Sequence, residues 1–165
     1  MKKDILFTSS LVRGKQGEDY IANFIKAHGY SVKRTEGYCH FDGIYYKRSD
    51  FDEPELWHYY DVKNQNAVSR GEIVLEITNN NNDSIDGKGW FTYAVEKNCV
   101  DEFFFTDCKG NVLVCTLKAL NDYYEWTKNS LRKADVNGEI VYINIKDLVD
   151  FAPQSVKFIQ NWKVN

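Results

Sequence analysis

The chain has 165 residues, of which 43% are hydrophobic and 15% are aromatic, and its formal net charge at pH 7 is −3. This length and composition predict one globular domain with its own hydrophobic core, and they exclude a disordered chain. The small negative net charge means that the protein lacks the overall basic field that is typical of many nucleic-acid-binding proteins.

The sequence carries no pattern of a targeting or membrane-spanning segment. No stretch approaches the roughly 18 consecutive apolar residues of a transmembrane helix. The apolar residues near the start are interrupted by Thr8, Ser9 and Ser10, which is not typical of a secretory signal peptide. The four cysteines lack the close spacing of structural zinc ligands and are expected as reduced thiols. We therefore expect a cytoplasmic protein without a membrane partner.

The first third of the chain predicts a loose segment with a short strand at 5–7, then a helix over 16–28 and a strand over 30–35. Apolar residues recur every three to four positions in this helix, and Gly29 provides a C-terminal stop. Glu18 lies at the edge of the apolar stripe. It is either a first-turn acid that is stabilised by the helix dipole or a carboxylate that leans toward the sheet.

The segment over 41–63 predicts an antiparallel hairpin. Both of its flanks are rich in aromatic and β-branched residues, and the acidic stretch between them carries turn-forming residues. Because side chains alternate along a strand, Asp61 and Lys63 point to the same face, and Gln65 follows one step further along that face. Asp42 begins the partner strand and could lie opposite Asp61. Two carboxylates and an amine would then meet on one surface.

A strand over 72–77 has apolar residues on one face and Glu76 on the other. A carboxylate in so apolar a strand is costly unless it is paired or bound to metal, or unless Glu76 faces water on an edge strand. An α/β (α+β) fold follows from this pattern and the elements expected further along the chain. These elements are a short helix or turn from 89, strands over 101–106 and 111–116, a helix over 117–132, a strand over 139–145 and a helical turn over 146–149.

Two carboxylates beside a lysine suit the binding of a divalent cation. Mg²⁺ is usually held by one or two carboxylates together with water and substrate phosphate. A nearby lysine can stabilise charge that develops on a phosphoryl oxygen, or help to activate water. The same residue pattern also occurs as ordinary surface charge, and in that case Asp42 and Lys63 would lie far apart.

The order of these residues resembles the PD-(D/E)XK nuclease superfamily. A helix with Glu18 precedes a strand with Asp42, a strand that reads D-V-K at 61–63 and a strand with Glu76. The segments V-L-E-I at 74–77, G-W-F at 89–91 and V-D-E-F-F-F at 100–105 further resemble small phage-type nucleases of that superfamily. The likeness covers about residues 18–105. Two departures are Phe41 in place of the family's proline, and an aspartate as the third-strand acid.

The resemblance implies a restriction-endonuclease-like fold, with a mixed central sheet flanked by helices, in a single domain over 1–165. It also implies hydrolysis of DNA phosphodiester bonds with Mg²⁺ or Mn²⁺, by an endonuclease rather than an exonuclease. The aspartates and glutamates would form the metal site, the lysine would assist water activation, and the glutamine would position water or phosphate. The implied site residues are Glu18, Asp42, Asp61, Lys63, Gln65 and Glu76.

Nucleases that cut two strands are often dimers, so a homodimer is one expectation. The alternative to an enzyme is a non-catalytic nucleic-acid-binding or regulatory module that retains the nuclease fold. The negative net charge and the missing proline before Asp42 are the features that favour this alternative.

Overall fold

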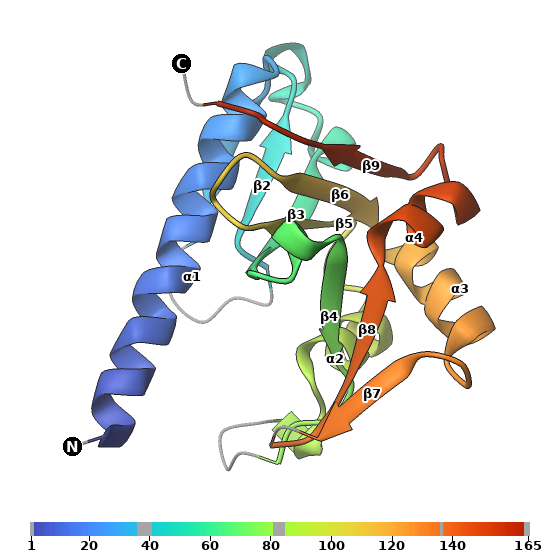
Figure 1. Ribbon diagram of the computed structural model, residues 1–165. Helices are drawn as coiled ribbons and strands as arrows, with labels where there is room; N and C mark the ends of the chain where they lie inside the picture. Colours follow the sequence, from blue (N-terminus) through green and yellow to red (C-terminus); the bar gives the residue numbers. More distant parts are fainter. Residues whose placement is uncertain (1, 36–40, 81–84, 136, 164–165) are drawn as a thin grey trace.

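The computed structural model describes residues 2–35, 41–80, 85–135 and 137–163. It is a mixed α/β structure in which helices pack on two β-sheets, as the sequence predicts (Figure 1). The helices are α1 (Lys2–Ala27), α2 (Trp90–Lys97), α3 (Leu117–Thr127) and α4 (Ile145–Phe151). The strands are β1 (Ser31–Arg34), β2 (Gly43–Tyr46), β3 (His58–Asn64), β4 (Glu72–Glu76), β5 (Glu102–Thr106), β6 (Val112–Thr116), β7 (Arg132–Asp135), β8 (Glu139–Asn144) and β9 (Val156–Ile159).

The larger sheet has six strands in the order β1-β2-β3-β5-β6-β9. β3 and β5 are parallel, and every other neighbouring pair in this sheet is antiparallel. The predicted hairpin is confirmed, because β2 pairs with β3 in a register that sets Gly43 opposite Tyr60 and therefore Asp42 opposite Asp61. The final strand β9, which the sequence did not predict, closes the far edge against β6.

The smaller sheet has three strands in the order β4-β8-β7. The helix that was expected over 117–132 ends at Thr127, so the prediction was wrong for its last turn. Arg132 instead begins β7, where its guanidinium lies 3.6 Å from the Tyr142 ring centroid and donates to the Glu72 carboxylate at 2.8 Å. These contacts with Tyr142 of the neighbouring strand β8 and with Glu72 of β4 beyond it favour the extended backbone at Arg132.

Helix α1 is longer than the sequence predicts. Residues 2–14 were expected as a loose segment with a short strand, but they continue the helix without a break to Ala27. Leu11 and Val12 are 59% and 53% exposed, so packing does not hold the helix at these positions. Once a packed segment has nucleated a helix, each added residue contributes a backbone hydrogen bond at little further entropic cost. The first half of α1 extends away from the body of the molecule in Figure 1.

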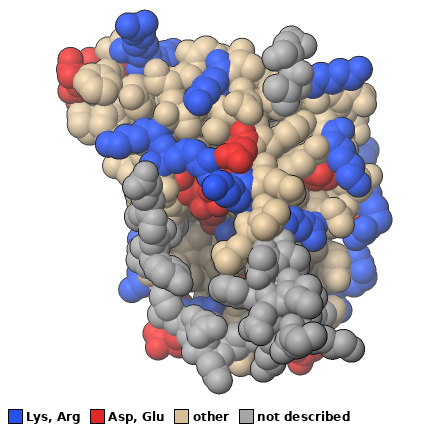
Figure 2. All heavy atoms as spheres, turned by 90° about the vertical axis from the view of Figure 1, so that its left-hand side faces the viewer, with Lys and Arg blue, Asp and Glu red and all other residues tan. Residues whose placement is uncertain are grey.

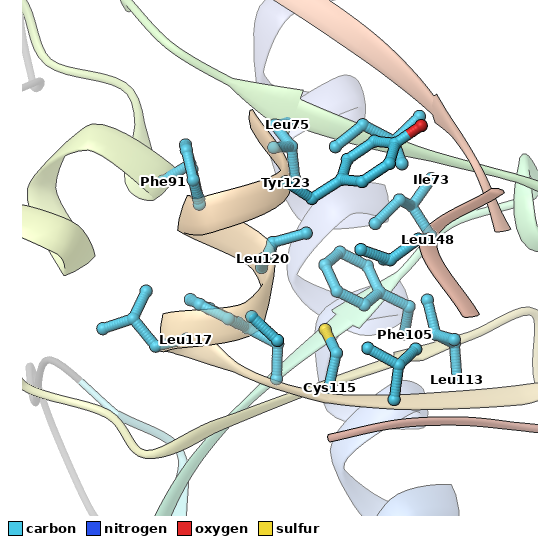
Figure 3. Close-up of a cluster of buried hydrophobic side chains, with 14 of the residues drawn as sticks. Ile73, Leu75, Phe91, Phe105, Leu113, Cys115, Leu117, Leu120, Tyr123 and Leu148 are labelled. Atoms are coloured by element: carbon cyan, nitrogen blue, oxygen red, sulfur yellow. The ribbon is translucent and has the colours of Figure 1, made fainter. Parts of the chain in front are cut away.

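Two hydrophobic cores hold these elements together. The larger core lies between the two sheets and helices α2, α3 and α4, and ten of its residues are labelled in Figure 3. The smaller core lies between α1 and the other face of the larger sheet, where Ile21 and Phe24 pack with Tyr60 and Phe104. The larger sheet is therefore covered on both faces. None of the helices in the described ranges combines the length and hydropathy needed to cross a lipid bilayer.

Candidate active site

Asp61 and Lys63 lie on the face of β3 that looks toward the larger core. The alternation of a strand puts both side chains on this face, as predicted. The Lys63 Nζ donates to the Asp61 Oδ2 at 2.7 Å, and the two side chains are only 22% and 15% exposed. They therefore form an ion pair that is largely withdrawn from water.

Asp42 completes this group from the neighbouring strand. Its backbone N–H donates to the Tyr60 carbonyl at 2.9 Å, and its Oδ2 accepts from the Val62 N–H at 2.7 Å. The carboxyl group is thus fixed against the β3 backbone between the positions of Asp61 and Lys63. The alternative in which Asp42 and Lys63 lie far apart is wrong.

The Asp42 and Asp61 carboxyl groups lie close enough to interact directly. Burial, and then the charge and hydrogen bond of Asp61, raise the pKa of Asp42 to about 8, against the lowering effects of Lys63 and the Val62 N–H. Two carboxylates so close in a poorly solvated site cannot both ionise easily. Near neutral pH the pair therefore holds one proton in the absence of a cation.

Lys63 remains an ammonium in this setting. Burial alone would lower the pKa of Lys63, but the charges of Asp61, Asp42 and Glu76 and the hydrogen bond to Asp61 outweigh it and raise the pKa above its ordinary value. A lysine with a raised pKa is poorly suited to accept a proton, whereas it can donate hydrogen bonds to an anionic group. The structure thus favours charge stabilisation by Lys63 over proton abstraction.

Trp90, at the start of α2, lies against the ammonium group. The Lys63 Nζ is 4.8 Å from the centroid of the Trp90 ring, which is a cation–π distance. The Trp90 ring packs in turn against Phe103 and Phe105, with centroid distances of 5.1 Å and 6.0 Å. The polar group therefore rests on an aromatic layer that limits water on one side.

Glu76 lies near this group but not within it. It ends β4 in the smaller sheet, and its Oε1 accepts from the Asn79 amide at 2.5 Å. Its charge still raises the pKa of Lys63. Within the residues that the structure describes, no three Asp, Glu, His or Cys side chains gather closely enough to hold a metal ion by themselves. Glu76 thus lies near the Asp42–Asp61 pair, and its role as a metal ligand stays a prediction.

Glu18 is on α1, which covers the opposite face of the larger sheet. It forms an ion pair with Arg34 of β1, and Arg34 also pairs with Asp19. Burial first, and then the charge of Asp42, raise the pKa of Tyr60 to about 12, while Arg34 lowers it and Glu18 raises it. Glu18 and Asp42 therefore both act electrostatically on the Tyr60 hydroxyl. The negative charge of Glu18 is balanced by its ion pair with Arg34.

The Gln65 side chain forms hydrogen bonds with the backbone of β4. Its Nε2 donates to the Val74 carbonyl and its Oε1 accepts from the Val74 N–H, both at 2.8 Å. The side-chain amide thus pairs with the backbone of Val74 as a neighbouring strand would, and it connects the end of β3 to β4. These two hydrogen bonds link the two sheets, and a role of Gln65 in positioning water or phosphate stays a prediction.

The sequence did not assign three contributors to this site. The Val62 N–H could not be found from side-chain patterns, because it is a backbone group. Arg34 is a single basic residue in a short strand and carries no local signal. Trp90 stood out as one of three aromatics in four residues, but its contact with Lys63 depends on how α2 docks on the sheet.

Comparison of the chain with known protein families, with curated proteins and with solved structures found no significant match.

Proposed function

We propose that this protein is a divalent-metal-dependent nuclease that hydrolyses phosphodiester bonds of DNA. The observation that carries the proposal is the Asp42–Asp61 pair, which holds one proton beside the Lys63 ammonium in a largely desolvated site. The resemblance of the residue order to the PD-(D/E)XK superfamily supports the same reaction. The mixed sheet with helices on both faces is compatible with that family's architecture.

The two aspartates fit a hard divalent cation. Carboxylate oxygens are the ligands that Mg²⁺ and Mn²⁺ prefer, and Mg²⁺ commonly keeps water and substrate phosphate for its other positions. A proton shared between two carboxylates marks a site where negative charge exceeds the available counter-charge. A cation bound by Asp42 and Asp61 would displace that proton and relieve the repulsion, and it would supply Lewis-acid stabilisation of a phosphate oxygen.

The other roles in the proposed reaction belong to residues around the two aspartates. The Val62 N–H holds the Asp42 carboxylate in a fixed orientation toward Asp61. Lys63 donates to phosphate oxygens and stabilises the negative charge that grows there, as its raised pKa favours. Trp90 and the phenylalanines packed against it exclude water on one side, which strengthens these interactions.

DNA as the substrate is supported by the distribution of basic residues. Helix α1, at the left of Figure 1, faces the viewer in Figure 2, where Lys and Arg cover more of the described surface than Asp and Glu do. Arg13 and Lys15 on α1 and Lys33 on β1 are exposed. A local basic surface can attract a phosphate backbone even when the net charge of the whole chain is negative.

The test is cleavage of DNA by purified protein and by the Lys63→Ala variant. Plasmid, linear and branched DNA would be incubated with Mg²⁺ or Mn²⁺ and analysed on gels. We expect the wild type to cleave at least one of these substrates and Lys63→Ala to be about 100- to 1,000-fold slower, because it loses a donor to the developing charge. Nicking of closed circular plasmid would identify an endonuclease.

The matched control is Lys118→Ala, which removes a lysine from another Lys–Asp pair on the exposed surface of α3. This variant should cleave at the wild-type rate. Equal cleavage by wild type and Lys63→Ala would falsify the assignment of the site.

A second candidate function is a non-catalytic nucleic-acid-binding or regulatory module. It is favoured by the observation that, across the described part of the chain, only two carboxylates meet at the candidate metal site. Titration with Mg²⁺ or Mn²⁺ separates the two candidates. A working metal site should raise the melting temperature by mass action, more so at pH 8 than at pH 6, because the bound cation replaces a proton. No shift in the wild type at millimolar metal would favour the module.

A further inference from the structure

A second concave site lies on the opposite face of the larger sheet, beyond the end of α1. Gly29 adopts a left-handed conformation with φ of 86°, which ends the helix and turns the chain into β1. The helix therefore covers only part of this face. The uncovered part forms a groove of about 570 Å³, within the range of small-molecule sites. A second hollow of about 530 Å³ adjoins it, since both are lined by Tyr30, His58 and Glu102.

Aromatic rings form the wall of this groove. The rings of Tyr45 and His58 stack at a centroid distance of 4.8 Å and an interplanar angle of 11°. Tyr45 is buried, whereas His58 is exposed and lines the groove. A planar ligand could therefore extend the stack on the outer side of the His58 ring. Any nucleobase can stack on an aromatic side chain in this way, because every base has a π-face.

A carboxylate is shared by the groove and the adjoining hollow. Glu102 is partly exposed and lines both hollows, and it accepts a hydrogen bond from the Tyr45 hydroxyl. A carboxylate has about four acceptor positions, so Glu102 retains acceptors for a ligand. Lys157 lines the groove, whereas the adjoining hollow is lined by Lys47 together with the acids Asp50, Glu55 and Asp101. The groove thus offers an aromatic platform, an acceptor at Glu102 and a cation at Lys157.

We propose that this groove binds a nucleotide, with the base stacked on His58, the donor edge of the base at Glu102 and the phosphate near Lys157. The base pattern that suits Glu102 best is guanine, whose N1–H and N2 amine are adjacent donors. Thymine presents one N–H between two carbonyl groups. The oxygens of these carbonyl groups would be repelled by the Glu102 carboxylate. The nucleotide is either free or one unit of a DNA single strand, since both offer the same chemistry.

This site is separate from the candidate active site. His58 and Asp61 are three residues apart on β3, which is about 10 Å along the strand, and they point to opposite faces. Nucleotide binding here needs neither a divalent cation nor hydrolysis. The inference therefore goes beyond the proposed nuclease activity and can be tested without it.

The experiment is titration of the metal-free protein with GMP and with TMP, in the presence of a chelator. Isothermal calorimetry gives the affinities, and amide chemical shifts locate the site. We expect saturable binding, shifts at Tyr45, His58 and Glu102, and tighter binding of GMP than of TMP. Lack of saturation at millimolar nucleotide, or shifts confined to the Asp61 and Lys63 region, would overturn the proposal.

Variants separate recognition from folding. Glu102→Gln should weaken GMP binding about 10-fold and remove the preference over TMP, because a charged acceptor is lost. His58→Ala should weaken both nucleotides about 5-fold, and His58→Phe should restore the loss because it keeps a stacking ring. The matched control Glu125→Gln, an exposed acid of α3, should bind as the wild type does. Wild-type affinity in both Glu102→Gln and His58→Ala would refute the site.

A single-stranded oligonucleotide distinguishes the two sources of the nucleotide. If it binds more tightly than GMP, the groove accommodates a strand; if it binds more weakly, a free nucleotide is the ligand. Lys118→Ala, the exposed control on α3, should bind either one as the wild type does. If the protein binds GMP in the groove but cleaves no DNA, only the nuclease proposal is contradicted. If it cleaves DNA but binds no nucleotide in the groove, only the groove proposal is contradicted.

Discussion

The Asp42 carboxyl group is subject to opposing electrostatic effects. Burial and the neighbouring Asp61 favour its neutral form, while Lys63 and the Val62 N–H favour its charged form. Burial and Asp61 have the larger effect, so the pKa of Asp42 rises from 3.8 to about 8. The neutral carboxyl can donate a hydrogen bond to Asp61, and a divalent cation would take the place of that proton.

The raised pKa of Asp42 predicts how stability depends on pH. Between about pH 4 and pH 8 the folded protein holds a proton that the unfolded chain has released, so stability should fall as pH rises through this range. One proton contributes a slope of at most about 1.4 kcal/mol per pH unit. Urea unfolding of the metal-free protein at a series of pH values measures this slope.

Asp42→Asn provides the comparison, because asparagine can keep the hydrogen bonds but does not titrate. We expect the slope of the variant to be flatter than that of the wild type. Asp150→Asn, which alters an exposed acid of α4, should retain the wild-type slope. Identical slopes for wild type and Asp42→Asn would show that Asp42 is not the titrating group.

Among the secondary-structure elements, the close pairing of β1, β2 and β3 positions the site. Gly43 is the first residue of β2, and a Cβ at this position would lie 2.7 Å from the Tyr60 hydroxyl and 2.8 Å from the Lys33 carbonyl. The absence of a side chain at Gly43 therefore lets the Tyr60 ring lie across β2, directly beside Asp42. The hairpin and its edge strand are thus packed too tightly here for any other residue.

We predict that Gly43→Ala destabilises the protein by about 1–3 kcal/mol, because the added methyl group overpacks this contact and one of the displaced atoms belongs to the backbone. Chemical denaturation measures the loss. The variant should also bind metal more weakly, since Asp42 is the adjacent residue.

The control for this prediction has the opposite sign. Gly14 lies in α1, and a Cβ added there would meet nothing within 4 Å. Gly14→Ala should therefore stabilise the protein by about 0.5–1 kcal/mol through helix propensity. A loss of stability in Gly14→Ala, or no loss in Gly43→Ala, would contradict this account of the two glycines.

In the molecule as a whole, the two sheets share one core. Buried residues of β4 and β8 pack with those of β5 and β6, and Leu75, Phe105 and Leu148 are among the side chains drawn together in Figure 3. Gln65 adds a polar link between the sheets. Because the same core is buried by both sheets, we expect them to unfold together in one cooperative transition.

Leu75→Ala tests this dependence. Leu75 is fully buried in β4, so its truncation should cost about 2–5 kcal/mol, through lost burial and a residual cavity. The loss should appear as a shift of one transition followed by both fluorescence and circular dichroism. Leu11→Ala, at a position 59% exposed on α1, should change stability by less than about 0.5 kcal/mol. Two separate transitions in Leu75→Ala would mean that the sheets fold independently.

Local sequence patterns were sufficient to predict the arrangement of the central residues of the candidate site. The two-residue period of β3 sets Asp61 and Lys63 on one face, and the same period buries Ile73 and Leu75 of β4. The turn between two strand-forming segments predicts the hairpin that brings Asp42 opposite Asp61. These features depend on neighbours in the chain, so periodicity and turn chemistry are enough to predict them.

Long-range packing determines which groups surround those residues. Trp90 meets Lys63, Gln65 engages Val74 and Glu18 pairs with Arg34 because separate elements dock in a particular arrangement. The placement of β4 in a second sheet follows from its pairing with β8, which lies far along the chain and sets Ile73 opposite Ile143. Such contacts are chosen by burial and pairing across the whole molecule, which no local pattern encodes.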